Sequence, residues 1–362
     1  MENPEEVYIE LRKHLDQQAV GFPATKSGVE IRILKHFFAP KEARLALHLN
    51  YQPRSALDIH NSIEGADPSL EKLTSMLEEM SRKGAIGTME KNRTEYFYTM
   101  PLLVGMVELK DKFTPQFGVD LAEYMMNGFI LSYMSTRVPQ MRTIPVEKSI
   151  EVEHRITPYD DIRQIINRSE GPIALIKCMC REGALARGKP CRTTSRLETC
   201  LNFGDWGRFF IKTGRGREVT RQEALEILRL NEADGLVLQP SNYQKVDFVC
   251  ACCGCCCGIL NIQKKLPNPA ESWSHNYYST IHAEDCTPCG ICAAKCQMKA
   301  IAIDPQSGYP AINLDRCIGC GNCVSACPTR AFRLVKVERE TVPPEDRTSL
   351  YRRLAERAPA DG

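Results

Sequence analysis

The sequence predicts an α+β protein built from several domains, and three observations lead to this class. The chain has 362 residues, which is enough for two or three domains with separate cores. Its first half carries amphipathic helices followed by a pair of short strands, whereas the second half has short apolar strands. All eighteen cysteines lie between Cys178 and Cys327, and their grouping separates a middle region from a C-terminal one.

Composition and charge exclude several classes of protein. The chain is 43% hydrophobic and 25% charged, close to the globular average, so it is not a disordered chain, a collagen or a coiled coil. Lys and Arg number 47 against 45 Asp and Glu, which rules out a strong overall field for nucleic acid or anionic lipid. The longest apolar stretch, near Met125–Met134, is far shorter than the roughly 20 residues of a membrane span. The acidic N-terminus lacks the apolar core of a secretory signal, so we expect a soluble cytoplasmic protein.

The C-terminal cysteines form a doubled motif. Two runs with the spacing C-x2-C-x2-C-x3-C begin at Cys286 and at Cys317, 31 residues apart. In bacterial [4Fe–4S] sites with this spacing, three thiolates of one run bind one cluster, and the fourth cysteine binds the other cluster. A pair of zinc sites is the alternative, but such sites use paired C-x2-C elements. The predicted ligands are therefore Cys286, Cys289, Cys292 and Cys327 for cluster one, and Cys317, Cys320, Cys323 and Cys296 for cluster two.

On this motif, residues 280–336 resemble the two-cluster bacterial-type ferredoxin domain. The second run ends in the usual proline, Pro328, whereas Gln297 stands in the corresponding place after the first run. The departure changes one turn and removes no ligand. The resemblance implies a ferredoxin-like fold, two [4Fe–4S] clusters and one-electron transfer at low potential.

The middle region, residues 151–265, reads as a small cysteine-rich α/β domain. The apolar run Ile173–Lys177 predicts a buried strand that ends at Cys178, and Val246–Val249 predicts a second strand that ends at Cys250. Between them, Thr220 is placed to cap a helix that stops at Gly235. Two strand ends therefore present cysteines at the same part of the domain.

Ten thiols in one small domain exceed what packing needs, and this density favours a soft metal or a cluster. We expect at least one further iron–sulfur cluster; zinc, a redox-active dithiol or sulfur-substrate site, and unligated cysteines are the alternatives. Adjacent cysteines alternate in direction on an extended chain, so the six of the second run cannot all face one cluster. The spread of the first four suits a single ligand set. The candidates are Cys178, Cys180, Cys191 and Cys200, then Cys250, Cys252, Cys253, Cys255, Cys256 and Cys257.

The N-terminal region is similar to winged helix-turn-helix domains over residues 25–105. Helices are expected over 28–38, from Pro40, over 55–63, and from an N-cap at Asp67 to Gly84. A hairpin with the polar tip Glu90–Arg93 follows. Acidic and basic side chains nearly balance on the last helix and the hairpin, which favours a protein-docking role over DNA binding. Residues 106–150 read as a helical connection, and residues 341–362 as a linker and a helix.

The order of these regions also resembles a family of iron–sulfur proteins of anaerobes. Its members share the Cys-x-Cys-Arg strand end, the Cys-x-Cys-Cys-x-Cys-Cys-Cys-Gly run and the ferredoxin tail, and the family implies an architecture more than a reaction. We expect an electron-transfer protein, free or as the subunit of a redox enzyme, with a redox protein as partner. A redox-responsive winged-helix regulator and an oxidoreductase acting on a disulfide or sulfur substrate are the alternatives. No catalytic residue stands out, so the sequence leaves open whether the protein is an enzyme.

Overall fold

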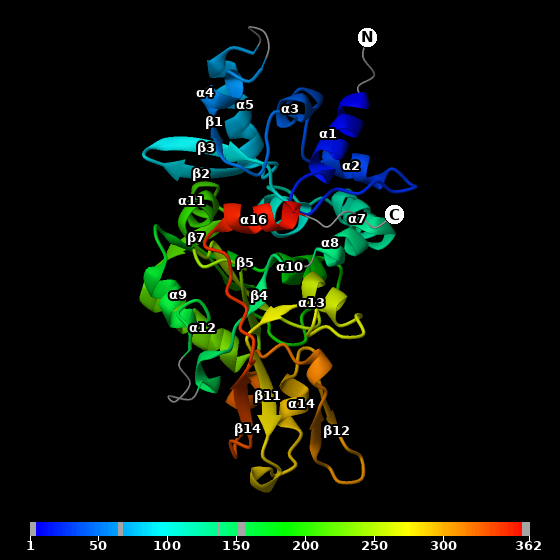
Figure 1. Cartoon of the computed structure of the whole chain (residues 1–362), viewed down its shortest axis with the longest axis vertical. Helices are drawn as coiled ribbons and strands as arrows, with labels where there is room; N and C mark the ends of the chain where they lie inside the picture. Colours follow the sequence, from blue (N-terminus) through cyan, green and yellow to red (C-terminus); the bar gives the residue numbers. More distant parts are fainter. Residues whose placement is uncertain (1–4, 64–67, 137, 151–155, 357–362) are drawn as a thin grey trace. The chain divides into compact units, whose positions relative to one another are not determined.

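Figure 1 shows the computed structural model of the chain, which describes residues 5–63, 68–136, 138–150 and 156–356. The chain divides into two compact units. Unit 1 comprises residues 1–138 and 347–362, and unit 2 comprises residues 139–346. The division cuts through the expected helical connection at 106–150, and it joins the C-terminal helix to the first unit.

Unit 1 is largely helical, with one small sheet. Its sheet has the strand order β1-β3-β2, and both strand pairs are antiparallel. The C-terminal helix packs with an apolar face, Leu350, Tyr351 and Leu354, while Arg347 lies 4.2 Å from the centre of the Tyr98 ring. The elements are α1 (Glu6–Asp16), α2 (Val29–Lys35), α3 (Pro40–Ala46), β1 (Arg54–Ser55), α4 (Ala56–His60), α5 (Leu70–Arg82), β2 (Gly87–Lys91), β3 (Thr94–Tyr98), η1 (Leu102–Met106), α6 (Val107–Leu109), α7 (Pro115–Tyr124), η2 (Met125–Phe129), α8 (Ile130–Ser135) and α16 (Arg347–Ala355).

The helices and the hairpin expected in the N-terminal region are present, with two differences. Strand β1 was not foreseen, because two residues carry no periodicity. The N-cap of α5 is Ser69, whose hydroxyl accepts a hydrogen bond from the backbone N–H of Lys72 at 3.4 Å. The N-cap expected at Asp67 lies outside the described residues. Leu73, Leu77 and Met80 form the buried face of α5, as the helical spacing predicts.

Helices α2 and α7 are joined by a buried carboxylate, Asp120, which is 2% exposed. It accepts hydrogen bonds from the Arg32 Nε at 3.0 Å, the His36 ring at 2.9 Å and the Gln116 amide at 3.2 Å. Burial alone would raise the pKa of Asp120, but the hydrogen bonds from His36 and Arg32 outweigh it and hold the pKa below its ordinary value. The ionised carboxylate is therefore the form that stabilises this unit.

We expect Asp120→Asn to destabilise unit 1 by about 2 kcal/mol at neutral pH, the scale of hydrogen bonds to a charged group. The stabilisation by a carboxyl with a lowered folded-state pKa is present above the unfolded-state value, at about pH 4, and is lost as the pH falls through the folded-state value. The difference between variant and wild type should therefore shrink in acid. Hydrogen exchange of the α2 and α7 amides measures this difference in stability. Glu123→Gln is the control, since Glu123 pairs with Arg32 at 2.6 Å but is partly exposed, and should change little.

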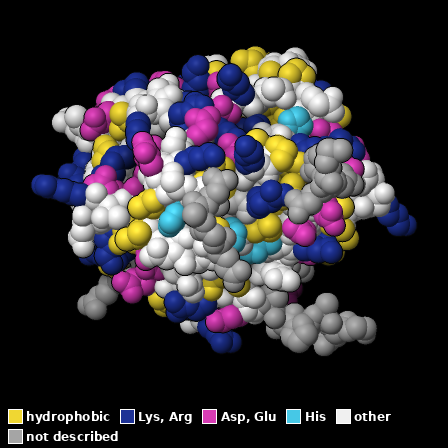
Figure 2. Space-filling model, turned by 90° about the horizontal axis from the view of Figure 1, so that it is seen from above, with side chains coloured by type: hydrophobic (Ala, Val, Ile, Leu, Met, Phe, Trp, Pro, Cys, Tyr) yellow, Lys and Arg dark blue, Asp and Glu magenta, His cyan; other side chains and the backbone are white. Residues whose placement is uncertain are grey.

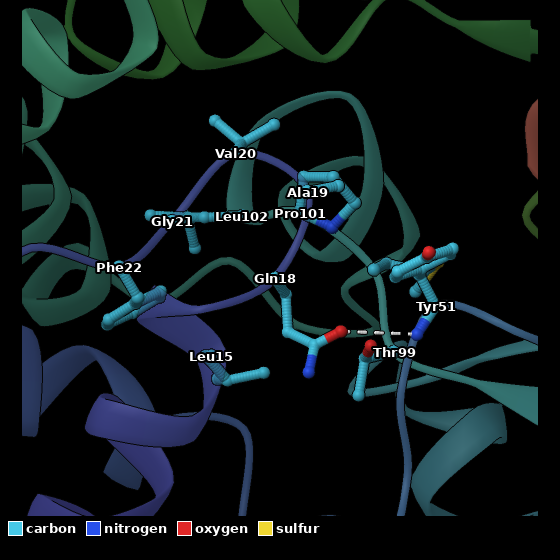
Figure 3. Close-up of a pocket in the computed structure, with 11 residues that line it drawn as sticks. Leu15, Gln18, Ala19, Val20, Gly21, Phe22, Tyr51, Thr99, Pro101 and Leu102 are labelled. Atoms are coloured by element: carbon cyan, nitrogen blue, oxygen red, sulfur yellow. Dashed lines mark hydrogen bonds between the residues drawn. The ribbon is translucent and has the colours of Figure 1, made fainter. Parts of the chain in front are cut away.

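A small hollow in unit 1 lies between the end of α1 and the segment after β3. Figure 3 shows its lining and the hydrogen bond from the Tyr51 backbone N–H to the Gln18 side-chain oxygen, at 3.3 Å. Its volume is about 10 Å³. A single water needs at least that much space, so the hollow is too small for an organic ligand.

Unit 2 contains a five-stranded sheet and a set of short elements that follows it. The order of the sheet is β7-β5-β6-β9-β8, and every neighbouring pair is antiparallel. The elements are β4 (Arg142–Thr143), η3 (Glu147–Ser149), α9 (Ile162–Arg168), β5 (Ile173–Lys177), α10 (Met179–Ala186), β6 (Glu198–Asn202), α11 (Gly204–Lys212), β7 (Gly216–Val219), α12 (Arg221–Ala233), β8 (Val237–Pro240), β9 (Phe248–Cys252), α13 (Gly258–Gln263), β10 (Ser274–His275), β11 (Tyr277–Ile281), η4 (Ala283–Asp285), α14 (Ile291–Lys295), β12 (Ile301–Ile303), β13 (Pro310–Ile312), η5 (Leu314–Arg316), α15 (Asn322–Ser325) and β14 (Phe332–Lys336).

The two faces of the five-stranded sheet differ in character. Leu175, Leu201 and Val249 share one face and form a core with residues of α9 and α12. Because side chains alternate along a strand, Cys200, Cys250 and Cys252 lie on the opposite face. The predicted strand at Ile173–Lys177 is confirmed, and so is the Thr220 cap of α12, which accepts from the Glu223 N–H at 3.1 Å. The second predicted strand starts later, at Phe248, and includes Cys250 and Cys252.

The C-terminal part of unit 2 has an internal repeat, as the doubled motif predicts. Strand β11 pairs with β14, and β12 pairs with β13. In each half a short turn leads into the cysteine loop, and a glycine in the left-handed region, Gly290 or Gly321, precedes a short helix. At Gly321 a Cβ atom would lie 2.1 Å from the Ser149 hydroxyl, so only glycine fits there.

Candidate metal centres

The four cysteines expected to hold cluster two line one cavity. Cys296 comes from the end of α14, whereas the other three come from the loop before α15 and from its first turn. The cavity holds about 30 Å³, more than a single water needs, but its other walls are mainly apolar, so a water would find few partners. The apolar residues are Met298, Ala300, Ile301, Ile312 and Ile318. Four convergent thiols in a dry cavity are a donor set that fits a [4Fe–4S] cluster.

The second group of thiols lies nearer the surface. Cys286 lies near Cys289 and Cys327, and Cys292 lies near Cys289 and Cys286. Cys289 is exposed, whereas Cys323 in the cavity is buried and Cys320 is half-buried. The structure thus brings together a cysteine from the second run with three from the first, and one from the first run with three from the second.

Local donors prepare two of these thiols for metal binding. Burial raises the pKa of Cys323 to about 12, and the Ser279 hydroxyl at 3.2 Å offsets part of that effect. At Cys327, burial is outweighed by hydrogen bonds from the Thr329 hydroxyl and from the backbone N–H groups of Phe332 and Ala331, which lower its pKa. These donors stabilise the thiolate, which is the form that binds iron.

The ten middle cysteines separate into two groups, and six of them form a closed ring. Each of the six has two others as its side-chain neighbours. Strands β6 and β9 supply Cys200, Cys250 and Cys252 from the same face of the sheet, and the starts of α10 and α13 supply the rest. In order around the ring they are Cys178, Cys200, Cys250, Cys252, Cys257 and Cys180.

The other four thiols form a tighter group, which we call the four-thiol site: Cys191, Cys253, Cys255 and Cys256. Their sulfur atoms all lie within 4.8 Å of one another. The expectation that Cys178, Cys180, Cys191 and Cys200 form one ligand set is therefore corrected, because Cys191 lies with the four-thiol site and the other three lie in the ring. The cause is the alternation along β9, which sends Cys250 and Cys252 to one face and leaves Cys253 on the other.

A buried arginine lies between the two groups. Arg181 is 1% exposed and donates to the Ala251 carbonyl at 3.0 Å, to the Thr199 hydroxyl and, at 3.9 Å, toward the Cys253 sulfur. Burial would lower its pKa, but negative charge on thiols such as Cys178 and Cys200 raises it. No carboxylate in the described residues forms an ion pair with this guanidinium. A buried cation needs compensating charge, and thiolate forms of these cysteines would supply it.

Gln297 links the C-terminal repeat to the four-thiol site. Its side-chain oxygen accepts from the Gly254 N–H at 2.7 Å, and its amide donates to the Gly235 carbonyl at 2.9 Å. Asn322, beside the cluster-two cavity, donates to the same carbonyl at 2.9 Å. Sequence reasoning noted Gln297 only as a changed turn; its position directly after Cys296 was the available signal for this contact.

Comparison with known families identifies a domain in the C-terminal part of the chain. Residues 279–328 match the family model of the 4Fe-4S dicluster domain. This part of the protein binds [4Fe–4S] clusters. The match covers both cysteine runs, ends before β14 and leaves the rest of the chain unassigned. A search of curated proteins finds no match to the chain. Within the described residues, no helix has the length and apolar character that crossing a membrane requires.

Proposed function

We propose that this protein transfers electrons, either as a free carrier or as the electron-transfer subunit of a larger redox enzyme. The observation that carries the proposal is the pair of four-cysteine groups inside the domain that matches the dicluster family. When bound, [4Fe–4S] clusters supply one-electron oxidation and reduction. The residues around them bind, exclude water and donate hydrogen bonds.

We propose that cluster one, held by Cys286, Cys289, Cys292 and Cys327, faces the redox partner. Cys289 is exposed, and the apolar side chain of Ile291, in the same cysteine run, is 40% exposed. Cluster two, held by Cys317, Cys320, Cys323 and Cys296, lies on the side where Gln297 contacts the middle domain. Electrons would then enter at the exposed end and leave toward the middle thiols, or the reverse.

We propose that the six-thiol ring holds the further iron–sulfur centre expected in the middle domain. Four of its members, Cys178, Cys200, Cys252 and Cys257, are buried, and the ring is closed by two sheet strands and two helix starts. Burial of this kind disfavours the alternative of a disulfide or sulfur substrate, because such a substrate needs access to a free thiol. Soft thiolates at this density suit iron–sulfur chemistry.

For residues 25–105 we propose a winged-helix module that docks on protein. The hairpin β2–β3 follows α5, and β1, which lies between α3 and α4 in the chain, pairs with β3; this arrangement supports the resemblance. The exposed side chains of α5 include Glu71, Glu78 and Glu79, and Arg82 is paired with Glu79 at 2.7 Å. On the face shown in Figure 2, basic and acidic side chains are interspersed.

DNA binding needs phosphate neutralisation, so we expect the protein to cause no salt-dependent gel shift of random DNA. A clear gel shift at low salt would favour the regulator instead.

The test of the electron-transfer role is reversible reduction of anaerobically prepared protein. Dithionite should bleach the visible iron–sulfur absorption and produce the EPR signals of two reduced [4Fe–4S] clusters, and oxidised methyl viologen should restore the absorption. A protein that binds clusters but neither accepts nor returns electrons would contradict the role. The cytoplasmic location and the relation to anaerobe proteins stay predictions.

The Gln297 contact gives a sharper prediction. Gln297→Ala removes two hydrogen bonds, together worth about 2 kcal/mol, so amides of the Cys253–Cys257 loop should exchange about 30-fold faster. Metal content should not change, because Gln297 binds no metal. Gln297→Glu is the matched control, since it keeps the acceptor for Gly254 and loses the donor to Gly235; an intermediate effect is expected. Unchanged exchange in Gln297→Ala would show that the contact does not hold the two parts together.

A further inference from the structure

The four-thiol site has a geometry that differs from the cluster sites of the same chain. Three sulfur–sulfur distances within it are short: 3.6 Å for Cys191–Cys253, 3.5 Å for Cys191–Cys255 and 3.7 Å for Cys255–Cys256. In a tetrahedral tetrathiolate with metal–sulfur bonds of about 2.3 Å, the sulfur atoms are about 3.8 Å apart. The three distances therefore match the edges of a tetrahedron around a single ion.

A cubane would require a wider arrangement. Each of its thiolates binds a different iron and points away from the cluster, so the sulfurs spread apart. The protein provides an internal comparison: in the described part of the chain, no three of the eight ferredoxin cysteines lie within 4.8 Å of one another, and the same holds for the six-thiol ring. The four-thiol site is the one group of cysteines there with this compact spacing.

The surroundings of the four-thiol site suit thiolate ligands. The Thr193 backbone N–H donates to the Cys191 sulfur at 3.4 Å, and the Thr193 hydroxyl lies 3.5 Å from the Cys255 sulfur. The Arg181 guanidinium is directed at the Cys253 sulfur. On the other side, the Lys264 ammonium donates to the Gly254 carbonyl inside the ligand loop. A divalent ion with four thiolates carries two negative charges, and these two cations offset them.

We propose that Cys191, Cys253, Cys255 and Cys256 bind one tetrahedrally coordinated divalent metal ion, zinc or iron, separate from every iron–sulfur cluster of the chain. Binding replaces four thiol protons by one ion and leaves no open coordination position, so the site is closed to substrate. It joins the Cys191 loop to the turn after β9. The proposal does not depend on the electron-transfer role.

The test compares metal content and spectroscopy of the full chain, purified anaerobically from medium containing both zinc and iron. Cys256→Ser should lose one metal ion per chain and keep its inorganic sulfide and ferredoxin EPR signals. Cys252→Ser, altered in the ring only, should keep that ion. In the unaltered protein, zinc X-ray absorption should show one shell of sulfur at about 2.3 Å without a metal neighbour. If no zinc is present, oxidised protein should show the high-spin ferric EPR signal of a lone tetrathiolate iron.

Two results would overturn the proposal. Loss of several irons together with sulfide from Cys256→Ser would mean that the four thiols hold a cluster. Retention of every metal ion would mean that they hold none. If the variant fails to fold, as shown by loss of the ferredoxin signals, the measurements on the unaltered protein decide: the absence of both the zinc–sulfur shell and the ferric signal excludes a single-ion site.

Discussion

Replacing Cys296 and Cys317 together by alanine should leave one intact [4Fe–4S] cluster, whereas replacing Cys286 and Cys296 together should damage both. The first pair belongs to one four-cysteine group in space, although its members come from different runs. The second pair belongs to one run in sequence but to different groups in space. A cubane that loses a thiolate ligand loses at least one iron, so the two variants separate the groupings cleanly.

EPR and iron quantification of the reduced variants measure this difference. Cys296→Ala/Cys317→Ala should retain about four irons in the ferredoxin part and one unperturbed reduced-cluster signal. Cys286→Ala/Cys327→Ala is the matched variant for the other cluster and should retain the complementary signal. The reverse outcome, with Cys286→Ala/Cys296→Ala keeping one intact cluster, would show that each run binds its own cluster.

Removing the charge of Arg181 should be the most damaging single change in the middle domain. Arg181→Met leaves the surrounding thiolates without their buried cation, and breaking a buried charge pair costs about 3–5 kcal/mol. We expect loss of metal from the middle cysteines and a lower unfolding midpoint of unit 2, while the ferredoxin clusters persist. Metal analysis measures the loss of metal. Tryptophan fluorescence measures the unfolding midpoint, since Trp206 and Trp273 lie in unit 2.

Arg181→Lys is the control for this prediction. Lysine keeps the charge but cannot donate to Ala251, Thr199 and Cys253 at once, so a partial loss is expected. If Arg181→Met retained all its metal and its stability, the charge of Arg181 would not be what stabilises the thiolates around it.

The doubled motif could be predicted from sequence because its information is local. The fixed gaps after Cys286 and Cys317 place three thiols in one loop. The second copy of the pattern identifies the run that supplies the fourth ligand. The alternation of side chains along β9 also predicted that the six-cysteine run would divide. Lys299 and Arg330, at equivalent places in the two halves, have a backbone in the left-handed region. The sequence could not predict this conformation, because neither residue type favours it.

The partners within the middle thiol field could not be predicted. Cys191 reaches Cys253 only because the sheet brings a loop beside a turn 62 residues away. Arg181 was visible as part of a Cys-x-Cys-Arg strand end, but its burial depends on β9 lying over it. Gln297 was visible only as a departure from the usual proline, and its two partners, Gly254 and Gly235, lie 43 and 62 residues away along the chain.

Iron and acid-labile sulfide measured together on anaerobically isolated protein test the central claim most directly. The two ferredoxin clusters alone require about eight irons and eight sulfides per chain, and a centre in the ring adds to both. We predict at least this content in brown protein whose reduced form shows two interacting cluster signals. Protein isolated without oxygen that holds no sulfide, and whose doubled motif is joined by disulfides, would contradict the account.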